Sequence, residues 1–329
     1  MTDRVIDSPQ TLKPVDIQSF RTATRNIDFD VYLKLSEDNV VHVFSRTTGL
    51  DYKRLAQYIQ KGVKHLFIHP DDEPAYTNFI SRPAEAVFTD PNTPQEKKIA
   101  TLLNMTEQNM AELFNQVAVE EETAVSSQKL IKSYVNLMTQ KPETLATILK
   151  LVSHGEYLYY HSIAVAIFSM FIAKATGQFN QKSLELVGMG GFLHDIGCTQ
   201  LPKEVVQSST ELSDDQWKEM HTHPKLGLKM IESTPSIPDE VRYIVYQHHE
   251  EPSGHGYPNG IHGPVIFYPA KIVALADAFS SLISTRPFRK AYTVPEAIKI
   301  IQGEQGKYDR GLVQLISAVF LRRDAKIAA

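Results

Sequence analysis

The chain begins with short segments that alternate apolar and polar residues, as strands joined by turns do. FDVYLKL (29–35) and VVHVFS (40–45) flank the turn-forming residues SEDN, which predicts a β-hairpin. Residues 51–61 then have the spacing of a short helix, and HLFIHP (65–70) that of another strand. Residues 1–20 are polar, and we expect them to be frayed. The pattern predicts a small α+β domain.

The later part of the chain has helical periodicity. Apolar residues recur at helical spacing across residues 100–151, and the segment that follows continues in the same manner. Two capping boxes, Ser213 with Gln216 and Thr293 with Glu296, predict the starts of later helices. The stretch SRPAEAVFTDPNTPQ, which precedes this region, contains several prolines and is predicted to be a linker.

These patterns predict three parts. Residues 1–90 form the small α+β domain, residues 91–150 a linker and helical segment, and residues 151–329 a helical domain. The expected fold class is mostly α, an all-helical domain preceded by a small α+β domain. One loop, residues 250–269, is rich in Gly and Pro and follows a pair of histidines. A loop of this length in a helical domain is usually functional or disordered, and its position favours function.

Composition narrows the class of protein. A length of 329 residues suits about two domains, and 42% hydrophobic with 22% charged residues is ordinary for a globular protein. The net charge of −4 argues against binding a nucleic-acid polymer through its backbone. Cys198 is the single cysteine, which excludes an internal disulfide and favours a reducing compartment. The N-terminus lacks a secretory signal, and the longest apolar stretch, residues 163–173, is too short to cross a membrane. We expect a cytoplasmic protein.

Most of the 12 histidines lie between His154 and His262, and several of them, with two aspartates, interrupt apolar segments. For example, Asp277 lies within IVALADAFSSLI, and Asp195 ends an apolar run. The candidate metal ligands are His161, His194, Asp195, His223, His248, His249 and Asp277.

Burying a lone carboxylate or imidazolium is costly unless it is paired or binds a metal. Imidazole and carboxylate groups suit transition metals, and a shared carboxylate can bridge two ions. Other interpretations exist for single residues. A histidine on an apolar helix is usually a core or capping residue, and Asp277 alone could be an N-cap or the partner of a buried arginine. The set as a whole favours a two-metal site. The default for His154, His221, His255 and His262 is a surface or loop position.

Six motifs across residues 155–315 are informative as a set. They are HSIAVA, FLHDIG, HTHPKLG, HHEEPSGHGYPNG, KIVALADAFSSLISTRPFRKA and GKYD. The sequence resembles the HD-GYP family, a subgroup of HD-domain metal-dependent phosphohydrolases that degrade cyclic di-GMP, a bacterial second messenger. The first domain is also similar to the small domain often found ahead of HD-GYP domains.

The resemblance implies two metal ions. The first would be bound by His161, His194, Asp195 and Asp277, and the second by Asp195, His223, His248 and His249. Asp195 would bridge the two ions. The resemblance implies iron or manganese, whereas ligand type alone equally allows zinc or cobalt.

The resemblance also implies a substrate site. Its loop beside the substrate pocket is formed by Gly256, Tyr257 and Pro258. Arg286 and Arg289 correspond to basic positions that contact substrate phosphates, a role that suits a guanidinium group. Lys290 is a neighbouring basic candidate. With the bridging Asp195, the two arginines are the residues expected to carry catalysis.

Three departures from the family pattern matter. Tyr157 occupies a position where some members have a Glu that supports a third metal, so we expect two ions. Cys198 replaces the usual Lys after HDIG, which removes one cation near the scissile phosphate and predicts a slow enzyme. His255 replaces the small residue that usually precedes the GYP motif.

We therefore expect a cyclic di-GMP phosphodiesterase, in which a hydroxide bridging two metal ions attacks a 3′–5′ phosphodiester. One alternative is a degenerate domain that senses a cyclic dinucleotide or docks a partner with little or no turnover. Another is a generic HD nucleotide phosphohydrolase, against which the GYP and RPFRKA motifs argue. The expected partners are cyclic di-GMP or a related cyclic dinucleotide and a protein signalling partner, without nucleic-acid polymer or membrane.

Overall fold

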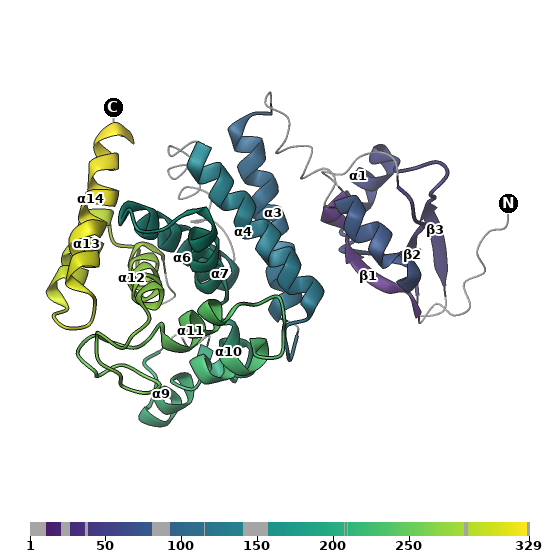
Figure 1. The fold of residues 1–329 in the computed structure, drawn as a ribbon. Coiled ribbons are helices and arrows are strands. Elements are labelled where there is room, and N and C mark those ends of the chain that lie inside the picture. The colour runs from purple at the N-terminus through teal and green to yellow at the C-terminus, as the bar shows by residue number, and fades with distance from the viewer. Residues whose placement is uncertain are drawn as a thin grey trace. The chain divides into compact units, whose positions relative to one another are not determined.

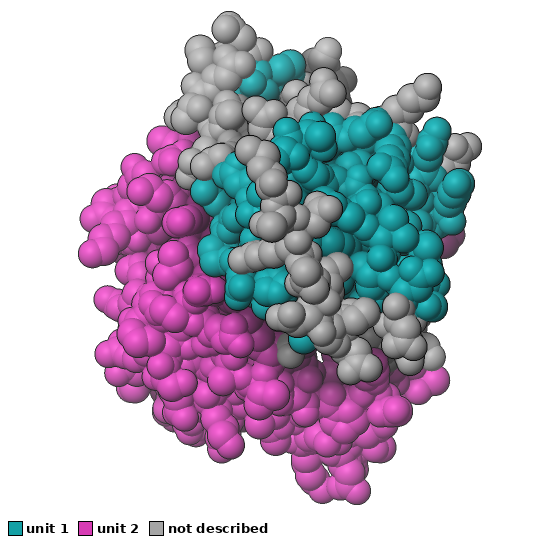
Figure 2. Space-filling view, turned by 90° about the vertical axis from the view of Figure 1, so that its right-hand side faces the viewer, with its two compact units in different colours: residues 1–101 teal, residues 102–329 magenta. Residues whose placement is uncertain are grey.

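A computed structural model of the chain describes residues 11–20, 27–36, 39–80, 93–114, 116–140, 157–206, 208, 210–285 and 289–327 (Figure 1). The chain divides into two compact units, residues 1–101 and residues 102–329, called unit 1 and unit 2 here (Figure 2). The predicted linker across residues 81–95 lies almost entirely outside the described residues. The predicted borders at residues 90 and 150 stay predictions.

Unit 1 contains a four-stranded antiparallel sheet in the order β1-β4-β2-β3. The strands are β1 (Lys13–Asp16), β2 (Val31–Lys34), β3 (Val40–Phe44) and β4 (His65–Ile68), and helix α1 spans Tyr52–Gln60. Strands β2 and β3 pair directly, which confirms the predicted hairpin. The short helix and the strand that follows it were also predicted correctly.

The prediction of a frayed N-terminus was wrong for residues 11–20. Strand β1 pairs with β4, and the 3-10 helix η2 (Ile17–Phe20) follows it. Ile17 and Phe20 are fully buried, and Phe20 contacts the rings of Phe29 and Phe79 in the core of unit 1. This segment is ordered because its few apolar side chains enter a core that is made by residues later in the chain.

Unit 2 is helical among its described residues. Its helices are α3 (Gln95–Phe114, which begins in unit 1), α4 (Glu121–Gln140), α6 (Tyr157–Ala175), α7 (Gln181–Leu193), η4 (Ile196–Gln200), α8 (Lys203–Val206), α9 (Asp214–Met220), α10 (His223–Ile231), α11 (Asp239–Gln247), α12 (Tyr268–Ile283), α13 (Val294–Gly303) and α14 (Arg310–Ile327). The predicted fold class, mostly α with a small α+β part, is confirmed.

Local sequence explains where several of these helices begin. The hydroxyl of Ser213 accepts a hydrogen bond from the Gln216 backbone N–H, and that of Thr293 accepts one from Glu296, with the reciprocal side-chain bonds also present. Both predicted capping boxes are therefore confirmed. None of the described helices combines the length and apolar character that a membrane crossing requires.

Helices α6, α7 and α12 pack on one another in the core of unit 2. Helix α6 is buried on every side from His161 to Ala173, as expected for a helix without a polar face. It approaches α7 closely at Gly191, where a Cβ would lie 2.9 Å from the Cα of Ala166. This close approach matters because α6 carries His161 and α7 ends beside His194.

Candidate metal centre

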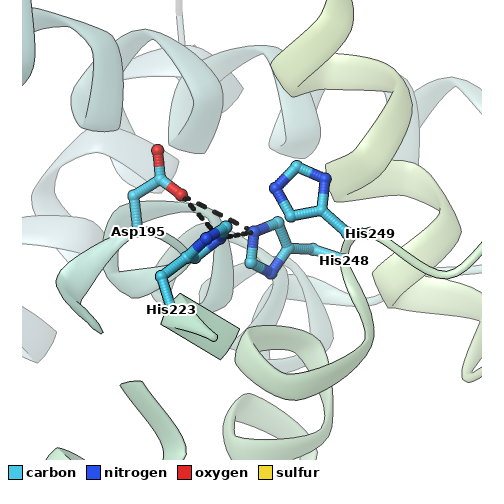
Figure 3. Close-up of side chains that lie close together, drawn as sticks. All are labelled: Asp195, His223, His248 and His249. Atoms are coloured by element: carbon cyan, nitrogen blue, oxygen red, sulfur yellow. Dashed lines mark hydrogen bonds and ion pairs between the residues drawn. The ribbon is translucent and has the colours of Figure 1, made fainter. Parts of the chain in front are cut away.

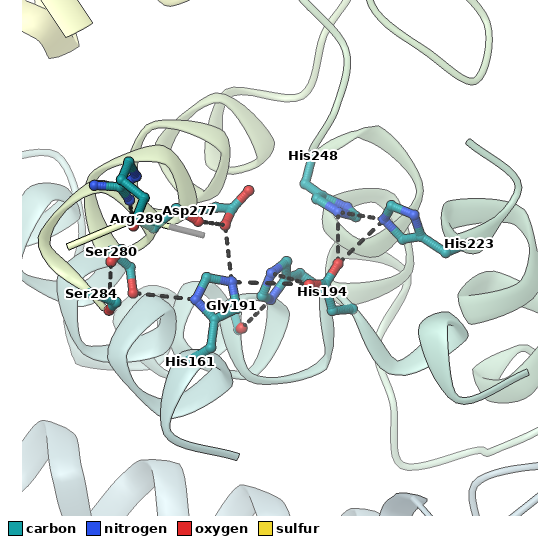
Figure 4. A network of polar contacts seen from close by, with 11 residues as sticks. His161, Gly191, His194, His223, His248, Asp277, Ser280, Ser284 and Arg289 are labelled. Atoms are coloured by element: carbon teal, nitrogen blue, oxygen red, sulfur yellow. Dashed lines mark hydrogen bonds and ion pairs between the residues drawn. The ribbon is translucent and has the colours of Figure 1, made fainter. Parts of the chain in front are cut away.

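The seven predicted ligands lie on separate helices or at helix ends. His194 is the C-cap of α7, and Asp195 directly precedes η4. His223 is the first residue of α10, and His248 is the C-cap of α11, with His249 next to it. His161 and Asp277 lie within α6 and α12. The structure brings all seven into one region of unit 2 (Figures 3 and 4).

Three histidines are oriented by the backbone just before them. The Nδ1 atoms of His194, His223 and His248 lie 2.8, 2.7 and 2.8 Å from the carbonyl oxygens of Gly191, Met220 and Val245, respectively. A carbonyl oxygen only accepts, so each Nδ1 carries the hydrogen and donates it. Each Nε2 therefore holds the lone pair in the neutral ring, which is the tautomer that a metal ligand needs.

These Nε2 atoms converge on the carboxylate of Asp195. Oδ2 lies 3.2 Å from His194 Nε2 and 3.9 Å from His161 Nε2, whereas Oδ1 lies 3.3 Å from His223 Nε2 and 3.6 Å from His248 Nε2. Each oxygen of Asp195 thus faces a different pair of imidazoles, and the dashed lines in Figure 3 mark the contacts with His223 and His248. The carboxylate divides the cluster into two halves.

Asp277 completes the half that contains His161. Its Oδ1 atom lies 3.0 Å from His161 Nε2. The other ring nitrogen of His161 lies 3.4 Å from the hydroxyl of Ser280, one turn along α12 from Asp277 (Figure 4). The same helix therefore holds both the carboxylate and the hydroxyl that orient this imidazole.

The cluster contains lone pairs that face one another without a proton to share. His223 Nε2 and His248 Nε2 lie 3.2 Å apart although both are acceptors in the neutral tautomer set by their Nδ1 bonds. His194 Nε2 is also buried; it lies outside hydrogen-bonding geometry within the described residues, although Asp195 Oδ2 is 3.2 Å away. A cation is the group that satisfies such an arrangement, and bonds of about 2.0–2.2 Å to nitrogen or oxygen suit the spacing of these atoms.

Two groups of atoms could each hold an ion. One is Asp195, His223, His248 and His249, and the other is His161, His194 and Asp195. Asp195 belongs to both groups, as the resemblance implies for a bridging ligand. The donors are nitrogen and oxygen, which suits a transition metal.

Neighbouring charges shift the pKa values within the cluster. Burial opposes ionisation of Asp195, yet the imidazoles around it, His194 foremost, hold the pKa of its carboxyl well below the usual range. Burial lowers the pKa of His194, but the carboxylates of Asp195 and Asp277 outweigh it and raise that pKa to about 9. At His223 burial dominates and lowers the pKa to about 4. A metal ion therefore has to displace a proton from His194 but not from His223.

Backbone packing positions Asp195 against His223. Helices η4 and α10 touch at Gly197, where a Cβ would overlap the carbonyl oxygen of His223 and lie 2.5 Å from the amide nitrogen of Gly227. Only the absence of a side chain at position 197 allows this approach. The glycine of the HDIG motif is thus part of the metal centre's scaffold.

The cluster lies at one wall of a cavity of about 770 Å³ within unit 2. This volume is in the range of small-molecule sites. Asp195, His223, His248 and Asp277 are among the lining residues, and so is Cys198. An apolar wall is formed by Val205, Val206, Leu212, Trp217 and Met220.

Burial and the nearby carboxylates raise the pKa of the Cys198 thiol well above its usual value, so the thiol is uncharged.

Tyr257 of the predicted GYP loop lines the cavity between two imidazoles. Its ring stacks on His221 at 3.9 Å and on His249 at 4.6 Å between centroids. Gly256 and Pro258 flank it but are not among the described lining residues. His221 is exposed in a turn, which confirms the predicted surface or loop position. Its stack on Tyr257 was not predicted, because the two residues lie far apart in the sequence.

Glu250 shapes the same loop and was assigned no role from the sequence. Its carboxylate is 2% exposed and accepts hydrogen bonds from the backbone N–H groups of Asn259, at 2.7 Å, and Ile261, at 3.0 Å. A buried carboxylate that receives two backbone donors is well satisfied. Its position directly after His248 and His249 was the signal that could have identified it.

Two of the three predicted basic residues, Arg289 and Lys290, are described by the structure. The guanidinium of Arg289 donates to the carbonyl oxygens of Ser281, at 2.7 Å, and Leu282, at 3.0 Å, at the C-terminal end of α12. Arg289 and the exposed Lys290 are not among the described residues that line the cavity. Arg286 lies outside the described residues, as does the side chain of Tyr157. The substrate-binding roles of these basic residues stay predictions.

Comparison with known proteins gives relatives with a shared chemistry. The chain is 27% identical over 206 residues to the cyclic di-GMP phosphodiesterase response regulator RpfG of Xanthomonas campestris, covering 60% of this chain and 53% of that protein. It is 28% identical to the cyclic di-GMP phosphodiesterase PA4108 of Pseudomonas aeruginosa, covering 51% and 40%. It is 28% identical to 3′3′-cGAMP-specific phosphodiesterase 1 of Vibrio cholerae, covering 46% and 34%. The chain thus matches about half or less of each relative.

A solved structure matches most of the chain, and a family model matches more than half of it. Bd1817, a HDG"Y"P protein from Bdellovibrio bacteriovorus, is 20% identical and superposes with a TM-score of 0.68, covering 94% of this chain and 99% of that one. At this identity the likeness shows a shared fold. The model of the HD domain matches residues 127–312, more than half of the chain and including every predicted metal ligand. The resemblance drawn from the motifs is thereby confirmed, and the chain belongs to the HD-domain family.

Proposed function

We propose that this protein is a metal-dependent phosphodiesterase that hydrolyses cyclic di-GMP at a dinuclear centre. The observation that carries the proposal is the sharing of Asp195 between two ligand groups at the wall of a cavity. Relatives named as phosphodiesterases of cyclic di-GMP and of 3′3′-cGAMP support the substrate class. The first ion is assigned to His161, His194, Asp195 and Asp277, and the second to Asp195, His223, His248 and His249.

The charges of the cavity explain why metal ions are required. The described acidic residues that line it are Asp195, Glu211, Glu250, Glu251 and Asp277, and Lys307 is the one lysine or arginine among the described lining residues. Such a wall repels a phosphodiester. Two bound ions supply positive charge to the scissile phosphate and lower the pKa of the attacking water.

The protein's own residues hold and shield this site. The backbone carbonyls of Gly191, Met220 and Val245 fix the rings that bind the ions, so little reorganisation is needed during the reaction. Tyr257, held between His221 and His249, covers one side of the second ligand group. We propose iron or manganese as the metal, in line with the family resemblance.

The test combines metal analysis with an assay of both cyclic dinucleotides. Protein purified anaerobically without chelator should contain two transition-metal ions per chain and convert cyclic di-GMP to a linear product, with 3′3′-cGAMP as the competing substrate. Asp215→Asn is the control for substitutions of Asp195, because Asp215 is exposed and its substitution leaves the cluster intact. Protein that contains no tightly bound metal would contradict the proposal.

A second candidate function is a sensor that binds a cyclic dinucleotide with little turnover. Cys198, an uncharged thiol in the cavity wall where the family has a lysine, is the observation that favours it. Cys198→Lys distinguishes the two. A clear gain in turnover at constant metal content indicates an enzyme limited by a missing cation, whereas wild-type protein that binds but never cleaves is a sensor.

A further inference from the structure

The cavity needs a second source of positive charge away from the metal centre. A cyclic dinucleotide carries two phosphodiester groups on opposite sides of its ring, and only one of them can occupy the metal centre at a time. The other is also anionic and enters a cavity whose described wall carries five acidic residues. Without a cation it would be poorly bound.

Two other basic residues predicted for the substrate site, Arg289 and Lys290, do not line the cavity among the described residues. Arg289 donates to backbone carbonyls at the end of α12, and Lys290 is exposed and does not line the cavity. Position 198 carries a cysteine, which has no basic group. Apart from the histidines of the metal centre, Lys307 is the one described lining residue with a basic side chain.

The loop between α13 and α14 holds Lys307 at the cavity wall. The backbone N–H of Ser253 donates to the carbonyl oxygen of Gly306 at 2.9 Å, which ties this loop to the loop that carries Tyr257. Gly306 has a φ of +82°, a conformation that favours glycine, so the turn before Lys307 is well specified. The base of the side chain is therefore placed by two loops that both border the cavity.

The ammonium group of Lys307 is accessible; it forms an exposed ion pair and lies 5.6 Å from the centroid of the Tyr308 ring. Its Nζ atom lies 2.7 Å from Glu304 Oε2, in an i,i+3 pair whose side chains are 44% and 39% exposed. An exposed pair of this kind contributes little to stability and is easily exchanged. The ion pairs among the described residues do not join Lys307 to Asp195 or Asp277.

We propose that Lys307 binds the phosphate of the cyclic dinucleotide that is not being cleaved, exchanging its ion pair with Glu304 for the substrate. This inference rests on the proposed function and assigns the same cavity a second anion-binding position. Because the ammonium would contact a group that does not react, it strengthens substrate binding and transition-state binding equally. Its loss should therefore raise KM and leave kcat unchanged.

Two substrates make the test specific. Cyclic di-GMP has two phosphates, whereas bis(4-nitrophenyl) phosphate has one, which must occupy the metal centre. Lys307→Met in the full metal-loaded chain should raise KM for cyclic di-GMP about tenfold, with kcat within about twofold of wild type. Both constants for bis(4-nitrophenyl) phosphate should be unchanged. Lys307→Arg should restore most of the affinity, and Lys299→Met, at an exposed position on α13, is the matched control.

A second variant tests the same idea from the other side. Glu304→Gln removes the competing carboxylate, so KM for cyclic di-GMP should fall by about twofold.

The affinity for cyclic di-GMP is also measured by calorimetry for each variant. If the wild type binds cyclic di-GMP without cleaving it, the proposed hydrolysis is refuted, but the affinities still test the role of Lys307. An unchanged KM and affinity in Lys307→Met, or an equal loss with both substrates, would overturn the assignment. Wild-type protein that neither binds nor cleaves would overturn both proposals.

Discussion

The polar groups of unit 1 and of the metal centre in unit 2 are paired in opposite ways. In unit 1, Arg46 donates to Asp30 at 2.9 Å and to Asp72 at 3.0 Å, so charges of opposite sign meet at the edge of the core. In the metal centre, the imidazole lone pairs of His223 and His248 face each other and a carboxylate. The first arrangement is complete within the chain, whereas the second requires a cation from outside.

This difference indicates which region evolved for stability and which for chemistry. An arginine between two carboxylates satisfies all three groups by hydrogen bonds. A buried cluster of acceptors destabilises the fold unless an ion binds, so its energetic cost has to be offset by function. Substitutions in the two regions should therefore differ in what they change.

The largest effect is expected for Asp195→Ala. Both ligand groups contain Asp195, so the variant should lose both ions and reduce hydrolysis by about a thousandfold or more. Metal analysis and the cyclic di-GMP assay measure these losses. The matched change in unit 1, Asp72→Ala, should leave metal content and turnover at wild-type levels. Retention of two ions by Asp195→Ala would show that this carboxylate does not bridge them.

The next effect concerns the scaffold and is expected for Gly197→Ala. The added Cβ would overlap the carbonyl oxygen of His223, and backbone atoms cannot move aside as a flexible side chain can. We expect a loss of about 3 kcal/mol in the free energy of unfolding, together with weaker metal binding. Gly303→Ala, where no atom lies within 4 Å of the new Cβ, is the control. Trp217 fluorescence follows the unfolding of unit 2, and equal stability of the two variants would refute the packing argument.

A smaller effect is expected for Glu250→Gln. The Gln amide can accept only with its oxygen. One of the two backbone N–H groups of Asn259 and Ile261 therefore loses its acceptor, and the other keeps an uncharged one. We expect about 1.5–3 kcal/mol less stability in the loop and a higher KM, because the loop carries Tyr257 into the cavity. Hydrogen exchange across residues 250–263 measures the loop, with Glu240→Gln on the exposed start of α11 as control. Unchanged exchange would indicate that Glu250 is not needed to hold the loop.

Features with local causes could be predicted from the sequence. The hairpin of β2 and β3 follows from a turn between alternating segments, and the capping boxes at Ser213 and Thr293 involve residues three apart. The predicted ligands came together because histidines and aspartates within apolar helices have few alternatives to a shared site. Their convergence on Asp195 agrees with the resemblance, which supplied the division into two groups.

Features that depend on distant partners could not be predicted. Strand β1 has four residues with only Val15 buried, and its partner β4 lies some fifty residues later. His221 has no apolar setting of its own, and its stack on Tyr257 exists only once the loop has folded back. Lys307 lies in a short motif, GKYD, and nothing in the local pattern indicates that its side chain reaches the cavity of the metal centre.

The smallest effect tests the paired charges of unit 1 through pH. Burial opposes ionisation of Asp30, but its hydrogen bonds with Arg46 outweigh this and lower the pKa of the carboxyl below its usual value. A carboxyl whose pKa is lower in the folded state stabilises that state above the unfolded pKa, near 4. This stability is lost as the pH falls from about 4 through the folded pKa. Because Arg46 is 39% exposed, solvent screens the pair, and we expect no more than about 1 kcal/mol. The hydrogen-exchange protection factors of β2 and β3, which are corrected for the pH dependence of the intrinsic exchange rate, should therefore fall at acidic pH in the wild type and respond less in Asp30→Asn. Equal pH dependence in the two proteins would assign the acid sensitivity of unit 1 to another group.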